Sequence, residues 1–149
     1  MKKIRDIMST YVETVQADAS VTEAAGRMRA FNVGALPVLE GNRVTGIITD
    51  RDIALRVTAI GKCGRFVRVR EVMTSEVVSC RPADTAAEAV RLMETHQVTR
   101  LLVMDSSSRL VGMVVLSDLA RQGLETLAGR VMAGMVQLIP VVPAMPTPP

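Results

Sequence analysis

The stretch SVTEAAGRMRAFNVGALPVLE, residues 20–40, returns as TAAEAVRLMETHQVTRLLVMD, residues 85–105. The two stretches align residue for residue at an offset of 65, without a gap. A fixed internal period indicates that a chain contains copies of one structural unit. We therefore predict a fold made of two similar halves.

Shorter repeated motifs flank this stretch on both sides. The motif IRDIMS, residues 4–9, aligns with VREVMT, residues 69–74, and GIITDRD, residues 46–52, aligns with GMVVLSD, residues 112–118. The offset grows from 65 to 66 because the turn GN of the first copy is matched by the longer turn SSS of the second. Loops absorb a change of length at low free-energy cost, so this difference fits two copies of one fold.

Within each copy the residue pattern predicts the order strand, helix, strand, strand, helix. Ser20 with Glu23, and Thr85 with Glu88, have the spacing of capping boxes at a helix start. Apolar residues follow at the i, i+3, i+4 and i+7 positions, which is typical of one buried helix face. Two runs of branched apolar residues joined by a short turn then indicate a pair of strands.

We predict an α/β (α+β) fold of two such repeats packed about a pseudo-twofold axis. The first repeat is expected at residues 1–62 and the second at residues 63–123, with a helical extension and a Pro-rich, disordered tail at residues 124–149. A unit of about fifty residues buries too little surface to be stable alone, so we expect the repeats to pack together. Proline removes a backbone donor and disfavours both helix and sheet, hence the prediction for the tail.

The composition excludes some classes of function. Hydrophobic residues make up 48% of the 149 residues and charged residues 22%, as in globular proteins. Aromatic residues are only 2%, which argues against stacking on single-stranded nucleic acid. The net charge of +3 is modest, and we interpret the basic run at residues 62–70 as a solvated connector rather than a phosphate-binding patch. A nucleic-acid-binding regulator is therefore the weaker alternative.

The cysteines and the hydropathy pattern bear on location. The two cysteines, Cys63 and Cys80, form no CxxC motif, so we expect reduced thiols and a cytoplasmic protein. No apolar stretch approaches eighteen residues, so no membrane span is expected, and the N-terminal residues do not have the pattern of a secretory signal.

The motif Thr49-x-x-Asp52 lies where a strand is predicted to end and a helix to begin. Threonine with an acid three residues later is a capping box, so these side chains could serve only to start the helix. The same geometry suits a ligand, because free amides at a helix start favour phosphate and a carboxylate accepts from ribose hydroxyls. The residues alone leave both interpretations open.

Taken together, the paired motifs resemble a stand-alone tandem pair of CBS domains, the cystathionine-β-synthase-type domains that form a Bateman module. The resemblance rests on IRDIMS/VREVMT, on VGALPVLE/VTRLLVMD and on GIITDRD/GMVVLSD, in the order and spacing of the family, and it covers residues 1–123. It implies a regulatory module rather than an enzyme. Such a module binds AMP, ADP, ATP or S-adenosylmethionine in clefts between the repeats, forms a homodimer and regulates a separate effector protein.

The resemblance also assigns ligand-binding roles to positions of this chain. The residues implied are Thr49, Asp52, Ser117 and Asp118 for the ribose, Gly34, Ala35, Arg51, Thr99 and Arg100 for the phosphates, and Thr14 and Cys80, on the first strand of each copy, for the adenine.

The two predicted sites are unequal. The first copy keeps Thr49 and Asp52 but offers no cation at residues 34–35, whereas the second gains Arg100 but has Val115 in place of the threonine. A hydrogen bond to a neutral partner is worth only about 1 kcal/mol net, so Val115 weakens a site without abolishing it. We therefore predict nucleoside binding at Thr49 and Asp52, with the phosphate charge met by Arg51 or, across the pseudo-twofold axis, by Arg100.

An enzyme and a purely structural homodimer are the remaining alternatives. An enzyme would need a nucleophile with a base, paired carboxylates or a metal cluster, and the single histidine, His96, has no such setting. A purely structural homodimer with empty clefts is the alternative to a ligand sensor. The sequence specifies neither the preferred adenosyl ligand nor the number of clefts that fill.

Overall fold

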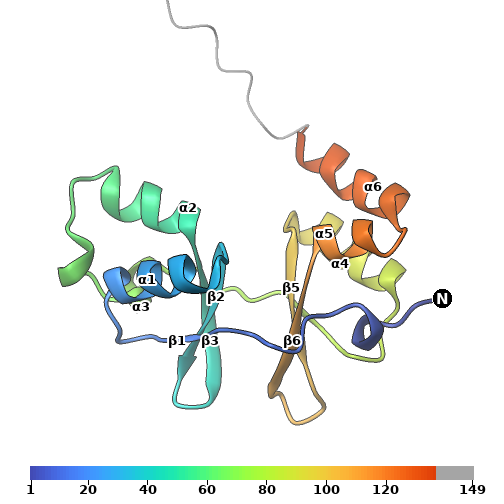
Figure 1. The fold of residues 1–149 in the computed structure, drawn as a ribbon, viewed down its shortest axis with the longest axis horizontal. Coiled ribbons are helices and arrows are strands. Elements are labelled where there is room, and N and C mark those ends of the chain that lie inside the picture. The colour runs from blue at the N-terminus through green and yellow to red at the C-terminus, as the bar shows by residue number, and fades with distance from the viewer. Residues whose placement is uncertain (137–149) are drawn as a thin grey trace, which may run out of the picture.

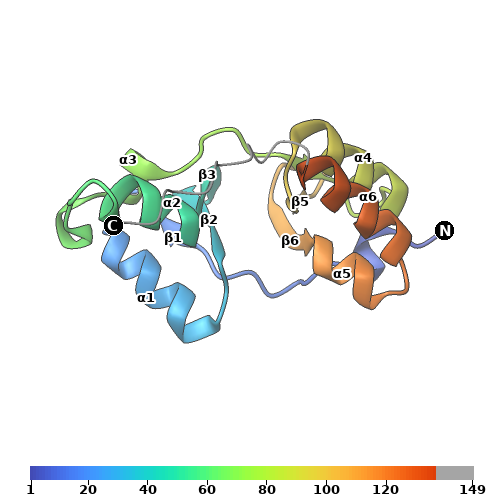
Figure 2. The ribbon, with the colours of Figure 1, turned by 90° about the horizontal axis from the view of Figure 1, so that it is seen from above.

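Two three-stranded sheets lie side by side in the computed structural model, which describes residues 1–136, and the helices lie outside them (Figures 1 and 2). Within each sheet the first strand runs parallel to the second, and the second runs antiparallel to the third. This α+β arrangement of two similar halves is the one predicted. Within residues 1–136, no helix is both long enough and apolar enough to cross a membrane.

The predicted order of elements is confirmed in both halves. The first half contains β1 (Val15–Gln16), α1 (Val21–Phe31), β2 (Ala35–Glu40), β3 (Arg43–Thr49) and α2 (Asp50–Ile53), which continues as a π-helical turn (Ala54–Thr58). The second half contains α3 (Val69–Val72), β4 (Ser79–Cys80), α4 (Ala86–His96), β5 (Arg100–Met104), β6 (Leu110–Val115) and α5 (Leu116–Arg121). Helix α6 (Glu125–Val136) follows, and the predicted disordered tail lies outside the described residues.

The helix starts follow the capping pattern with one difference. Thr85 and Glu88 form the full box, since each side chain accepts a hydrogen bond from the other's backbone N–H, at 3.2 and 2.6 Å. Ser20 accepts from the Glu23 N–H at 3.1 Å, but the Glu23 carboxylate pairs with Arg27 at 3.5 Å. The first box is therefore only half formed, because the i+4 arginine competes for the carboxylate.

The short segment that precedes each half packs on the other half. We call residues 3–9 and 67–74 the lead segments. Ile4 and Ile7 are buried in the core of the second half, whereas Val69 and Val72 are buried in the core of the first. In Figure 1 the N-terminal chain starts beside the second half and crosses to β1. The two halves are therefore intertwined, and each core is incomplete without the lead segment that precedes the other half.

Each lead segment is joined to a strand by a pair of hydrogen bonds beside a glycine. Ser9 exchanges N–H···O bonds of 2.9 and 3.0 Å with Met113 of β6, and Thr74 does the same with Ile47 of β3 at 2.9 Å. A β-carbon added to the neighbouring Gly112 would lie 2.7 Å from the Met8 sulfur and 2.9 Å from the Ser9 carbonyl oxygen. The glycine is therefore required because the lead segment approaches the strand closely.

We expect Gly112→Ala to lower the free energy of unfolding by about 1–3 kcal/mol, because the added methyl forces the lead segment off β6. Urea denaturation followed by circular dichroism measures this change. The matched control is Gly26→Ala in α1, where an added β-carbon meets nothing within 4 Å. There alanine should raise stability by up to about 1 kcal/mol through its higher helix propensity. Equal effects at the two positions would contradict the close-approach argument.

Candidate functional site

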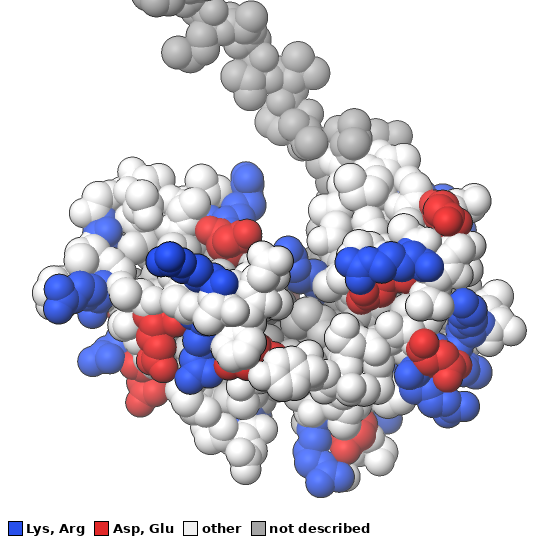
Figure 3. All heavy atoms as spheres, viewed as in Figure 1, with Lys and Arg blue, Asp and Glu red and all other residues white. Residues whose placement is uncertain are grey.

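Two clefts lie between the halves, and equivalent positions of the two repeats line them. The Asp118 cleft, of about 750 Å³, takes residues 9–13 and 32–35 from the first half and residues 113–121 from the second. The Thr49 cleft, of about 400 Å³, reverses this pattern and takes residues 47–52 from the first half and residues 74–78 from the second. The surface view in Figure 3 shows the hollow between the halves, with acidic and basic side chains at its rim.

The Thr49 motif forms a complete capping box at the start of α2. The Asp52 Oδ2 accepts from the Thr49 N–H at 2.9 Å, and the Thr49 hydroxyl accepts from the Asp52 N–H at 3.1 Å. The other carboxylate oxygen, Asp52 Oδ1, lies 3.9 Å from the Nε of Arg56, an exposed side chain. One oxygen of Asp52 is therefore committed to the backbone, while the second faces a weak partner that a ribose hydroxyl could replace.

The second copy retains only the acidic half of this arrangement. The Asp118 Oδ2 accepts from the Val115 N–H at 2.9 Å, and Asp118 Oδ1 lies 3.3 Å from Arg121 Nη1. Val115 has no hydroxyl to accept from the Asp118 N–H. Asp118 is nevertheless only 9% exposed, and among the described residues it is the one buried charged side chain. The carboxylate is thus held in the same place in both clefts, with and without the threonine.

The structure groups the predicted phosphate residues differently from the sequence. Gly34 and Ala35 line the Asp118 cleft and not the Thr49 cleft, although they belong to the same repeat as Thr49. Thr99 and Arg100 line both clefts. The pairing of Gly34 and Ala35 with Thr49 was therefore wrong, because each cleft forms between a helix start of one half and the β-strand start of the other.

Arg100 lies at the junction of the two clefts. Its guanidinium is half-buried, and within residues 1–136 no side chain or carbonyl pairs with it by a hydrogen bond or a salt bridge. A β-carbon added to Gly34 would lie 3.5 Å from Arg100 Nη2 and 3.1 Å from Asp50 Oδ2. Because Gly34 has no side chain, Arg100 and Asp50 both have room beside it between the halves. The repeat-equivalent position of Arg100 is Ala35.

Of the other predicted residues, Ser117 lines the Asp118 cleft and Arg51 the Thr49 cleft, whereas Thr14 and Cys80 line neither. The Thr14 carbonyl accepts from Arg27 Nη1 at 3.2 Å. Cys80 is buried in the core of the second half and borders a separate hollow of about 360 Å³. The walls of the clefts are formed instead by residues 11–13 and 76–78, which lie further before β1 and β4.

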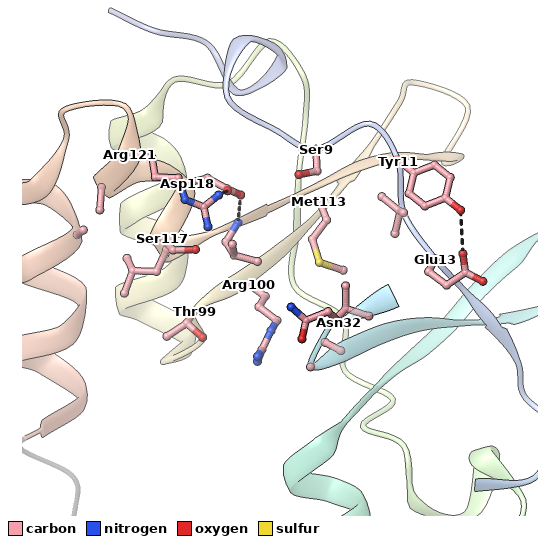
Figure 4. Close-up of a pocket in the computed structure, with 18 of the residues that line it drawn as sticks. Ser9, Tyr11, Glu13, Asn32, Thr99, Arg100, Met113, Ser117, Asp118 and Arg121 are labelled. Carbon is pink, nitrogen blue, oxygen red and sulfur yellow. Dashed lines mark hydrogen bonds and ion pairs between the residues drawn. The ribbon is translucent and has the colours of Figure 1, made fainter. Parts of the chain in front are cut away.

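Sequence reasoning missed the residues that precede β1 and β4. Tyr11, Val12 and Glu13 line the Asp118 cleft, and residues 76–78, one repeat later, line the Thr49 cleft. The repeat offset could have found them, because both sets follow the lead segments at the same distance. Figure 4 shows Tyr11 and Glu13 on the wall opposite Asp118 and Arg121. Tyr11 is 73% exposed, and its hydroxyl donates to Glu13 Oε2 at 3.3 Å.

Helix α6 contributes to both clefts. Its buried residues Ala128 and Val131 pack in the core of the second half, and Arg130 pairs with Glu94 at 3.2 Å. Met132, half exposed, lines the Asp118 cleft, and Met135 lines the Thr49 cleft. The sequence predicted a helical extension here but no part in the clefts. Within residues 1–136 no group of three or more His, Cys, Asp or Glu is placed to hold a metal ion.

Exchanging threonine and valine at the equivalent positions Thr49 and Val115 should change the free energy of unfolding in opposite directions. Thr49→Val should lower the free energy of unfolding by about 1 kcal/mol, because the Asp52 N–H loses its acceptor. Val115→Thr should raise it by about 0.5–1 kcal/mol, because the new hydroxyl can accept from the Asp118 N–H. Each variant is the control of the other in thermal unfolding. A loss of stability in both would show that the valine is required by packing.

The two thiols should differ in reactivity. Burial, with a smaller contribution from the nearby Asp84 carboxylate, raises the pKa of Cys80 from 9.0 to about 12. The thiolate is the nucleophile, so Cys80 should stay protonated and unreactive at pH 8. Cys63 is exposed. Iodoacetamide at pH 8 followed by peptide mass spectrometry should find Cys63 modified and Cys80 intact until the chain is unfolded. Comparable labelling of both would contradict this assignment.

Comparison with known proteins agrees with the fold. Residues 4–58 and 69–125 each match the family model described as CBS domain. The chain is 46% identical over 120 residues to the CBS domain-containing protein YhcV of Bacillus subtilis, covering 80% of this chain and 84% of that one. It is 33% identical to homoserine O-acetyltransferase of Methanocorpusculum labreanum, but that match covers only 23% of the enzyme.

A solved structure adds a liganded example. The CBS domain pair of protein MJ0100, in complex with 5′-methylthioadenosine and S-adenosyl-L-methionine, superposes with a TM-score of 0.74 at 26% identity. The superposition covers 82% of this chain and 99% of that one.

Proposed function

Since this chain belongs to the CBS domain family and carries two such domains in tandem, we propose that it is a regulatory module that senses an adenosine-containing ligand. The ligand would be AMP, ADP, ATP or S-adenosylmethionine, bound in the clefts between the halves. Binding biases the chain toward one conformation, and that difference in free energy is passed to a separate partner protein.

The observation that carries this proposal is the pair of equivalent clefts, each lined by a carboxylate held by the backbone N–H at the end of the preceding strand, Asp52 in one and Asp118 in the other. Their volumes of about 750 and 400 Å³ lie in the range of small-molecule sites. Asp52 and Asp118 each have one oxygen that faces only an exposed arginine. A carboxylate in that state can accept from the vicinal hydroxyls of a ribose. The adenosyl ligands of the MJ0100 domain pair support the same ligand class.

The proposed roles follow the position of each side chain. Asp52, assisted by the Thr49 hydroxyl, and Asp118, beside Ser117, hold the ribose hydroxyls in their respective clefts. Arg100 carries the charge that meets a phosphate group. Gly34, Ala35 and Thr99 provide further phosphate contacts, and Arg51 contacts the ligand of the Thr49 cleft. Thr14, directly before β1, and Cys80, on β4, are the positions that the family resemblance implies for the adenine, but they line neither cleft and act only through the backbone there.

The homodimer and the effector protein belong to the same proposal. Large apolar side chains are exposed on the first half, among them Leu55 at 50% and Phe66 at 83%. Such residues suit a surface that another chain covers. The alternative function is a structural module whose clefts stay empty and whose partners bind without a nucleotide.

Thermal unfolding against AMP, ATP, S-adenosylmethionine and adenosine tests the proposal. A ligand at a hundred times its dissociation constant stabilises the folded state by about 2.7 kcal/mol, a shift of several degrees. At least one compound should produce this shift. The shift should fall when the ligand's own cleft loses its carboxylate, in Asp52→Ala or in Asp118→Ala.

The matched control is Glu88→Ala, which removes a capping carboxylate of the same kind from α4, outside both clefts. It should lower the melting temperature but preserve the ligand shift. No shift with any of the four compounds would favour the structural module.

A further inference from the structure

The two clefts share one frame but differ in charge at equivalent positions. The differing positions, given for the Thr49 cleft and then for the Asp118 cleft, are Asp50 and Leu116, Arg51 and Ser117, and Glu76 and Tyr11. Each pair is related by the offset of 65 or 66 that relates the repeats. Equivalent backbone segments therefore line both clefts, but the charged side chains that a ligand meets differ between them.

In the Thr49 cleft, carboxylates outnumber guanidinium groups. Asp50, Asp52 and Glu76 line it together with Arg51 and Arg100. The single ion pair formed by these carboxylates with described residues is that of Asp52 with Arg56, at 3.9 Å. Asp50 accepts only from the adjacent Arg51 N–H, at 2.8 Å. The lining therefore carries one more negative than positive charge, which opposes the binding of a phosphate.

In the Asp118 cleft, each carboxylate already has its own arginine. Glu13 pairs with Arg27 at 2.8 Å, and Asp118 pairs with Arg121 at 3.3 Å. Arg100 is left as a cation without a partner among residues 1–136. Figure 4 shows the Arg100 guanidinium extended beside Asn32, apart from the pair of Asp118 and Arg121. The lining carries two carboxylates, Glu13 and Asp118, and two guanidinium groups, Arg100 and Arg121, so an anionic group meets less opposition here than in the Thr49 cleft.

The two clefts have only this one arginine in common. Arg100 lines both, and its repeat-equivalent position holds Ala35, so the chain has no second cation there. A guanidinium that forms a charge-assisted bond with a phosphate in one cleft is no longer available to the other. Two phosphorylated ligands in one chain would also bring their charges together at the junction.

We propose that the two clefts divide adenosyl ligands by charge. A phosphorylated nucleoside binds in the Asp118 cleft and pairs with Arg100, and a nucleoside without a phosphate binds in the Thr49 cleft. One chain therefore holds one phosphorylated ligand at a time. This inference rests on the proposed function and adds to it the class of ligand that each cleft selects.

Titration calorimetry with AMP and adenosine, two probes that differ by a single phosphate, tests the division of ligands. AMP should bind at one site per chain. Adenosine should still bind to the AMP-saturated protein, and Asp52→Ala should remove this additional binding while Asp118→Ala should not.

The arginines provide matched variants. Arg100→Gln should weaken AMP binding at least about tenfold, the loss expected for a hydrogen bond between charged groups, and should leave adenosine binding in the Thr49 cleft within about twofold. Arg43→Gln, which removes an exposed guanidinium outside both clefts, should leave AMP binding unchanged.

Three results would overturn the inference. Two AMP sites per chain, or AMP binding that depends on Arg51 and Asp52 rather than on Arg100 and Asp118, would contradict the division while leaving the proposed function intact. Absence of binding by both AMP and adenosine in the wild-type chain would remove the proposed function and this inference with it.

Discussion

The exchange of lead segments is the constraint on which the rest of the structure depends. Each half completes its core with residues that precede the other half in the chain, and a glycine in β3 or β6 admits the lead segment at close range. Both clefts lie beside these contacts, since residues 9–13 and 74–78 leave the lead segments and form one wall of each. The spacing of the clefts is therefore set by packing rather than by their own polar residues.

This shared frame lets the two copies diverge in chemistry without loss of fold. The carboxylates of Asp52 and Asp118 keep equivalent backbone bonds, at 2.9 Å in each copy. Among the positions around them, Arg51 and Ser117 are exposed and free to differ, whereas Leu116 is buried in the core of the second half. Substitution at cleft positions alters the charge that a ligand meets, while the buried apolar positions continue to specify the fold.

The repeat made most of the fold predictable from the sequence. Offset, capping spacing and apolar periodicity depend on neighbours along the chain, so the elements and their order follow from them. The composition of each cleft depends on which segments cross between the halves, and no local pattern specifies that crossing. Gly34 was therefore assigned to the wrong cleft, and Tyr11 and Met132 were missed. For a similar reason the sequence did not predict that Glu23 pairs with Arg27. The spacing allows its carboxylate to bind either Arg27 or the Ser20 N–H of the capping box, and in the structure it pairs with Arg27.

The exchanged lead segments also constrain how such a chain can arise. A single copy of this unit, with its lead segment directed away from its own sheet, can complete its core only by taking that segment from a second molecule. A one-copy ancestor with this geometry would have been an obligate, segment-swapped dimer with two identical clefts. Tandem duplication of its gene turns the intermolecular exchange into an intramolecular one. The two clefts are then encoded separately, and each is free to acquire its own ligand.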